Sequence, residues 1–179
     1  DMEKLLDIGQ GNLQIIFSGK AHPKDMGGKS IIRNIVQSAK RFDGKIKIIY
    51  LENYDMWLGR LITSGVDLWL NTPQRPNEAS GTSGMKAALN GIPNFSILDG
   101  WWAEGCQEGK NGWAIGSQKA GSDDKDARDL YKKLKNEIIT TFYDDRDGWV
   151  TMMKESIKTS VQFTSQRMVS QYHEMYYKV

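Results

Sequence analysis

A glycine-rich segment between residues 78 and 91 contains the residue types best suited to chemistry. It reads E-A-S-G-T-S-G-M-K-A-A-L-N-G, which predicts a turn running into a short helix with Lys86 in the first helical turn. A Ser/Thr/Gly turn at a helix start presents free backbone N–H groups and the positive end of the helix dipole, which together favour an anion such as phosphate. Lys86 would then lie within one turn of that anion.

An amine beside a phosphate-binding turn suits a cofactor that carries an aldehyde at one end and a phosphate at the other. The lysine condenses with the aldehyde while the turn holds the phosphate. Pyridoxal phosphate has this layout. Taken alone, however, the run from Ser80 to Gly84 is more often a capped turn than a ligand site, and a single lysine is a common surface residue.

The same segment resembles the cofactor-lysine segment of the α-glucan phosphorylases, the family of glycogen, starch and maltodextrin phosphorylases. Two earlier segments resemble motifs that precede it in that family: Phe17-Ser18-Gly19-Lys20-Ala21-His22-Pro23 and Ile49-Tyr50-Leu51-Glu52-Asn53-Tyr54. Residues 99–104 and 111–116 look like the shorter bacterial and archaeal branch. The resemblance is specific from about residue 13 to 116, and family chains are several times longer than this one.

The resemblance implies a set of cofactor contacts. Lys86 would bond covalently to pyridoxal phosphate, and Tyr54 would line the cofactor pocket. The residues that would approach the cofactor and its phosphate are Thr82, Ser83 and Gly84. Asp55 departs from the animal and plant pattern, which has a basic residue there, so no cofactor role passes to Asp55. Without the resemblance, Tyr54 could equally be a surface aromatic at the start of a helix.

The resemblance also implies a sugar site. Glu78 matches the glutamate that accepts hydrogen bonds from glucosyl hydroxyls, with Ser80 and Gly81 offering backbone contacts to the same ring. A carboxylate suits this task because an ionised one only accepts hydrogen bonds and hydroxyls donate them. Lys86 and Glu78 are therefore the expected catalytic residues, although Glu78 alone would more often be a solvated carboxylate.

Family members carry out phosphorolysis of terminal α-1,4-glucosyl units to glucose 1-phosphate. By resemblance, the cofactor phosphate exchanges a proton with substrate phosphate, which protonates the leaving glycosidic oxygen; a second pKa of about 6 suits that role. The implied partners are α-glucan, phosphate and the amino-terminal domain of the same enzyme. That domain and an upstream basic segment lie outside this chain, so we expect the 179 residues alone to have little or no activity and uncertain cofactor occupancy.

The motifs need a scaffold that brings them together. Apolar runs predict strands at residues 13–17, 46–50, 66–70, 95–98 and 113–115, with helices between the first three over 32–39 and 54–62. This alternation predicts an α/β fold with a doubly wound, Rossmann-like parallel sheet. The resemblance makes it the carboxyl-terminal half of a glycosyltransferase-B-type fold. The three motifs follow strands, so they should meet at the carboxyl edge of the sheet.

The remaining residues complete the expected organisation. Helical periods after Ser122, a candidate N-cap, predict several helices over about 122–179, and the length favours a single domain over 1–179. Trp101, Trp102 and Trp113 could bind sugar, but packing is the commoner role of such residues.

Composition narrows the function classes. Lys and Arg number 24 against 22 Asp and Glu, so the net charge of +2 gives no reason to propose nucleic acid or a membrane surface as a partner. One cysteine, Cys106, excludes an intrachain disulfide, and His22 lacks the neighbours of a metal site. No apolar run approaches the roughly 20 residues that span a bilayer, and we expect a cytoplasmic protein.

Two other functions fit parts of the sequence. A nucleotide-sugar glucan synthase shares the two-domain architecture and a glutamate loop at the same sheet edge, but it does not need Lys86. A noncatalytic sugar-binding module would need only the sugar contacts. Pyridoxal phosphate binding at Lys86 separates a phosphorylase from both.

Overall fold

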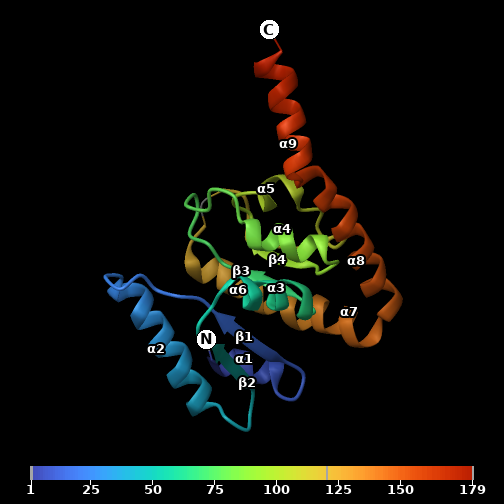
Figure 1. Ribbon diagram of the computed structural model, residues 1–179. Coiled ribbons are helices and arrows are strands. Elements are labelled where there is room, and N and C mark those ends of the chain that lie inside the picture. The colour runs from blue at the N-terminus through green and yellow to red at the C-terminus, as the bar shows by residue number, and fades with distance from the viewer. Residues whose placement is uncertain (1, 120, 179) are drawn as a thin grey trace. The chain divides into compact units, whose positions relative to one another are not determined.

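The computed structural model describes residues 2–119 and 121–178 (Figure 1). Helices and parallel strands alternate along the first two thirds, and helices follow to the end, which confirms an α/β fold with a helical carboxyl-terminal part. The chain divides into two compact units, residues 1–60 and 61–179. A single domain over 1–179 stays a prediction.

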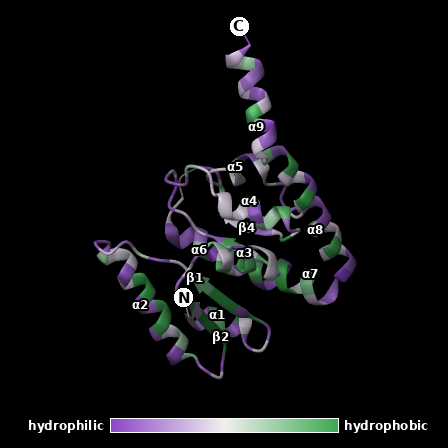
Figure 2. Cartoon of the chain, viewed as in Figure 1, coloured by the Kyte–Doolittle hydropathy of each residue, from purple (hydrophilic) through white to green (hydrophobic). Residues whose placement is uncertain are grey.

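The first unit contains a two-stranded parallel sheet. Its elements are α1 (Met2–Gly9), β1 (Gln14–Ser18), α2 (Met26–Arg41) and β2 (Lys47–Leu51). Figure 2 shows β1 in the colours of apolar residues, and Ile16 pairs with Ile49 in parallel register. Helix α2 packs against β2, as a crossover between parallel strands requires. Helix α3 (Met56–Gly65) spans the division between the units.

The second unit contains a three-stranded parallel sheet in the order β3-β4-β5. The strands are β3 (Trp69–Asn71), β4 (Asn94–Ile97) and β5 (Gly112–Ile115), and every residue of β4 and β5 is buried. Helix α4 (Thr82–Leu89) connects β3 to β4, and the short α5 (Trp102–Gly105) connects β4 to β5. All five predicted strands are present, in two parallel sheets. The doubly wound sheet and the glycosyltransferase-B architecture stay predictions.

A run of helices completes the second unit. It comprises α6 (Asp123–Lys133), η1 (Leu134–Ile138), α7 (Ile139–Asp144), α8 (Arg146–Ser160), η2 (Val161–Phe163), α9 (Ser165–Tyr172) and η3 (His173–Tyr177). Ser122 is the N-cap residue of α6, as predicted, although its side chain makes no capping hydrogen bond. Helix α8 packs against α4 and buries Trp149 and Met152.

Tryptophans form much of the core of the second unit. Trp101, Trp102 and Trp113 are 5%, 1% and 2% exposed, so they pack in the interior and do not form a sugar platform. Trp102 Nε1 donates to the Trp113 carbonyl oxygen at 3.2 Å, and the Trp101 ring meets Phe163 edge to face. Among the described residues, no helix has the length and apolar character needed to cross a bilayer.

Candidate functional site

Helix α4 has a packed face and an exposed face. Gly84, Ala87 and Ala88 are buried, whereas Thr82 and Lys86 are exposed. Residues three or four positions apart lie on the same side of a helix, which explains both groups. The helix therefore packs through its small residues and presents Thr82 and Lys86 together on its free side.

The start of α4 leaves two backbone donors free. Gly81 precedes the helix in the left-handed conformation (φ 81°, ψ 43°), and its carbonyl oxygen accepts the N–H groups of Gly84 at 3.1 Å and Met85 at 3.5 Å. Within the described parts of the chain, the N–H groups of Thr82 and Ser83 have no hydrogen-bond acceptor. Free amides at the positive end of a helix favour an anion. The binding of a phosphate here stays a prediction.

Lys86 lies in the last turn of α4, so the prediction that it occupies the first turn is wrong. The left-handed Gly81 starts the helix at once, so that Thr82 and Ser83 form its first turn and not a preceding loop. Lys86 still lies four residues from Thr82 on the same side of the helix. Its amine makes no ion pair or hydrogen bond with any described residue.

These features fit pyridoxal phosphate. The exposed, unpaired Lys86 amine is available to an aldehyde, and the two unpaired amides at the start of the same helix are available to a phosphate. One short helix thus offers a group for the aldehyde and, at its start, groups for the phosphate.

Gly84 belongs to the packed face. A Cβ atom there would lie 2.6 Å from Asn94 Oδ1 and 2.8 Å from Trp101 Nε1, and Asn94 Nδ2 donates to the Gly84 carbonyl oxygen at 3.2 Å. The absence of a side chain lets α4 approach β4 closely. The contact of Gly84 with a cofactor stays a prediction, while its packing role is evident.

The loop before α4 places the Glu78 carboxylate beside the helix start. A Cβ atom on Gly81 would lie 3.5 Å from Glu78 Oε1. The Glu78 backbone N–H donates to Asp99 Oδ2 at 3.0 Å, and Trp101 N–H donates to the Ser80 carbonyl oxygen at 2.9 Å. The Glu78 carboxylate itself has no partner among the described residues, so it is free to accept hydrogen bonds from a ligand.

In the first unit, two of the motifs meet at one sheet edge. Ser18 Oγ donates to the Leu51 carbonyl oxygen at 3.0 Å, and Tyr50 Oη donates to the Gly19 carbonyl oxygen at 2.7 Å. The segments that follow β1 and β2 are therefore joined at the carboxyl ends of these strands. The meeting of all three motifs at one sheet edge stays a prediction. His22 Nδ1 accepts the Lys24 N–H at 3.2 Å and so shapes the turn after β1.

Tyr54 and Asp55 immediately precede α3. Tyr54 is 39% exposed and lies outside the helix that was predicted to include it, because α3 begins at Met56. Asp55 Oδ1 accepts the Leu58 N–H at 2.7 Å, which caps the helix start. This cap gives a structural reason for an acidic residue at position 55. The place of Tyr54 in a cofactor pocket stays a prediction.

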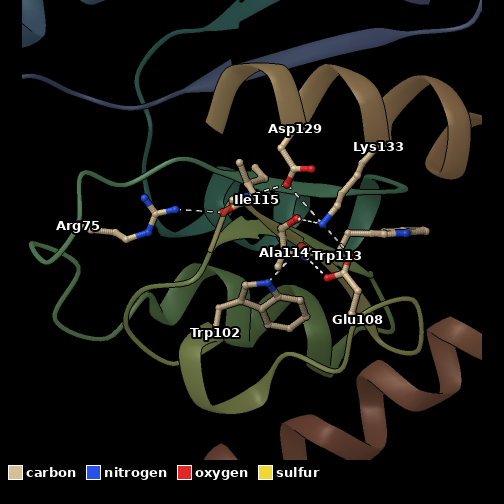
Figure 3. A network of polar contacts seen from close by, with 9 residues as sticks. Arg75, Trp102, Glu108, Trp113, Ala114, Ile115, Asp129 and Lys133 are labelled. Atoms are coloured by element: carbon tan, nitrogen blue, oxygen red, sulfur yellow. Dashed lines mark hydrogen bonds and ion pairs between the residues drawn. The ribbon is translucent and has the colours of Figure 1, made fainter. Parts of the chain in front are cut away.

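A buried ion pair that no motif predicted holds the loop before Glu78. Arg75 Nη1 donates to Asp126 Oδ2 at 2.7 Å, and the two side chains are 9% and 11% exposed. Arg75 Nη2 also donates to the Ile115 carbonyl oxygen at 3.1 Å (Figure 3). The loop is thereby tied to β5 and α6. The partners lie 51 residues apart in sequence, so local pattern carried no signal for the pair.

A second group of charges covers the edge strand β5. Glu108 Oε2 accepts the Ala114 N–H at 2.7 Å, and Lys133 Nζ donates to the Ala114 carbonyl oxygen at 2.8 Å and to Glu108 Oε1 at 2.7 Å (Figure 3). Asp129 lies 3.4 Å from Lys133 Nζ. Burial alone would lower the pKa of Lys133, but Glu108 and Asp129 outweigh it and raise that pKa. These contacts satisfy backbone groups that an edge strand leaves unpaired.

Cys106 is poorly suited to act as a nucleophile. Burial, together with the charge of Glu108, raises the pKa of its thiol to about 12, so the thiolate is scarce near neutral pH. Within the described ranges, no group of His, Cys, Asp and Glu side chains is arranged to hold a metal ion.

Comparison with known proteins identifies the family. The family model described as "Carbohydrate phosphorylase" matches residues 7–113. The chain is 46% identical to the maltodextrin phosphorylase of Thermococcus litoralis and 45% identical to the glycogen phosphorylase of Aquifex aeolicus. It is 43% identical to the glycogen phosphorylase of Mycobacterium tuberculosis.

Each of these alignments covers 98% of this chain but only 22%, 26% and 22% of the respective relative. The chain therefore spans about a quarter of the length of the curated relatives that it matches. The family match includes the segments after β1, β2 and β3 on which the predicted resemblance rested, and the prediction is confirmed. The chain belongs to the carbohydrate phosphorylase family.

Proposed function

We propose that this chain is the cofactor-binding, carboxyl-terminal segment of a pyridoxal-phosphate-dependent α-glucan phosphorylase. The complete protein would convert terminal α-1,4-glucosyl units and phosphate to glucose 1-phosphate. One observation carries the proposal: the unpaired Lys86 amine extends from the exposed face of a short helix whose first two backbone N–H groups are unpaired, and the unpaired Glu78 carboxylate lies beside the start of that helix.

One set of residues would bind the cofactor, and another would bind the sugar. The Lys86 amine would anchor the aldehyde of pyridoxal phosphate, and the Thr82 and Ser83 amides would bind its phosphate. When bound, the cofactor supplies a phosphate whose second pKa of about 6 allows proton exchange near neutral pH.

Glu78 would accept hydrogen bonds from hydroxyl groups of the terminal glucosyl unit, and the Ser80 and Gly81 backbone would contact the same ring. These contacts orient the sugar so that its glycosidic bond faces the phosphate. A sugar needs acceptors at fixed positions, because its hydroxyl groups donate in defined directions.

The wider architecture belongs to the same proposal. The segment would have a doubly wound, Rossmann-like fold, as one half of a glycosyltransferase-B-type fold in the cytoplasm. The amino-terminal domain would supply the remaining sugar contacts and phosphate-binding cations, so the isolated segment would have little activity. A nucleotide-sugar synthase or a noncatalytic module would leave the unpaired Lys86 without a role.

The test measures phosphate-dependent release of glucose 1-phosphate from maltooligosaccharides by the complete protein. Lys86→Ala is expected to lower kcat by at least about a thousandfold, an order typical of losing acid catalysis. Lys125→Ala, which removes an exposed lysine from α6, serves as the matched control and should keep wild-type kcat. No glucose 1-phosphate from the wild-type protein, or full activity in Lys86→Ala, would contradict the proposal.

A further inference from the structure

We propose that Asp99 is a positioning residue for Glu78: it holds the loop backbone so that the Glu78 carboxylate lies beside the start of α4. The inference deepens the proposed function and rests on it. Asp99 lies two residues beyond the end of β4, outside the glycine-rich segment. It acts through the backbone and not on the substrate.

Both carboxylate oxygens of Asp99 accept backbone hydrogen bonds. Oδ2 accepts the Glu78 N–H at 3.0 Å, and Oδ1 accepts the Gly100 N–H at 3.0 Å. Asp99 therefore links the loop before α4 to the turn after a fully buried strand. Hydrogen bonds to a carboxylate are stronger than those between neutral groups, so this link is a firm one.

The two segments also touch closely on either side of this link. Trp101 N–H donates to the Ser80 carbonyl oxygen at 2.9 Å, in the direction opposite to the Glu78 bond. Gly100 has φ 53°, and a Cβ atom there would lie 2.7 Å from the Ser80 oxygen and 3.0 Å from Glu78 Cγ. The turn is thus packed against the stem of the glutamate side chain itself.

The Glu78 carboxylate depends on this support because it has no partner of its own among the described residues. The backbone fixes where its side chain starts, and Asp99 fixes that backbone. A displacement of about 1 Å in a substrate-orienting group can cost about a hundredfold in rate. Loss of the Asp99 bond should consequently affect sugar turnover more than folding.

The first arm of the test is a double-mutant cycle in the complete protein. Asp99→Asn keeps the size of the side chain but places an amide donor against one of the two backbone N–H groups. We expect kcat/KM for maltooligosaccharide phosphorolysis to fall roughly tenfold to a hundredfold. In a Glu78→Ala background, which lacks the positioned carboxylate, the same substitution should change kcat/KM by less than about twofold.

The second arm measures amide hydrogen exchange of the peptide that contains Glu78. Exchange should become faster in Asp99→Asn and stay at the wild-type rate in Asp67→Asn, the same chemical change at an exposed position before β3. If Asp99→Asn does not fold, both measurements use Asp99→Glu instead. Its side chain is longer by one methylene group, which displaces the carboxylate oxygens.

The outcomes separate the two proposals. Wild-type protein that releases no glucose 1-phosphate contradicts the proposed function, and the exchange arm still reports whether Asp99 holds the loop. Active protein in which Asp99→Asn lowers kcat/KM equally with and without the Glu78 carboxylate overturns the role of Asp99 alone. Amide exchange of the Glu78 peptide that stays at the wild-type rate in Asp99→Asn also overturns the role of Asp99.

Discussion

Glu78 and Lys86 lie within one short segment, but neighbouring elements hold the backbone around Glu78 and leave the Lys86 side chain exposed. The loop that carries Glu78 is held from three other places: by the side chains of Asp99 after β4 and Asp126 in α6, and by the backbone N–H of the buried Trp101. Lys86 lies on an exposed helix face, and its amine makes no hydrogen bond or ion pair with the described residues. The backbone that carries the carboxylate is therefore held in advance, whereas the lysine side chain has no such support.

This difference matches the two kinds of ligand proposed for the site. Hydrogen bonds to sugar hydroxyls depend on distance and angle, so their acceptor must be held before the sugar arrives. A covalent bond to an aldehyde imposes its own geometry, so the lysine needs only access and a nearby place for the phosphate. The packed face of α4 still sets the direction in which Lys86 leaves the helix.

Removal of one charge from the buried pair should have the largest effect on stability. Arg75→Met leaves Asp126 buried without its partner, which should lower the free energy of unfolding by about 3–5 kcal/mol. Urea unfolding monitored by tryptophan fluorescence measures the change. The double variant Arg75→Met/Asp126→Leu, which removes both charges, should regain most of the loss. A single-variant loss below about 1 kcal/mol would mean that the loop is held weakly.

A substitution on the packed face of α4 should have an intermediate effect on stability. Gly84→Ala places a methyl group 2.6 Å from Asn94 Oδ1 and 2.8 Å from Trp101 Nε1, and should lower the free energy of unfolding by about 1–3 kcal/mol. Gly27→Ala is the matched control, because it lies in the first turn of α2 and its nearest neighbour is 3.5 Å away. The control should be neutral or slightly stabilising. Equal losses in both variants would show that packing at Gly84 is not special.

A substitution on the exposed face of α4 should have the smallest effect on stability. Lys86→Ala is expected to change the free energy of unfolding of the cofactor-free protein by less than about 0.5 kcal/mol, because the side chain is exposed and unpaired. The same urea titration measures it. A loss of 2 kcal/mol or more, on the order of a lost buried contact, would break the contrast between the two residues.

Elements with a strong hydrophobic period were predictable from the sequence. The runs that became β1, β2, β4 and β5 are apolar and bounded by turn residues, and α2, α3, α6 and α8 show helical spacing. The helices α1 and α5 were not predicted: both are short, and α5 is a single turn around Trp102. Lys86 was misplaced by one turn because Ser, Thr and Gly suit both a loop and a helix start.

The support of the site was not predictable from local pattern. Glu78 and Lys86 lie in a segment whose composition marks a ligand loop, but Asp99 and Asp126 lie 21 and 51 residues from their partners. Such pairs arise only when the sheet brings the ends of β3, β4 and β5 to one edge. Long-range polar contacts depend on the complete fold, whereas the glycine turn depends on its own residues.

The most direct test of the account is to identify the lysine that binds the cofactor. The complete protein is incubated with pyridoxal phosphate, reduced with borohydride and digested, and the labelled peptide is identified by mass spectrometry. The account predicts one dominant adduct on Lys86, absent from Lys86→Ala and retained in Lys125→Ala. No specific adduct, or one on a different lysine, would contradict it.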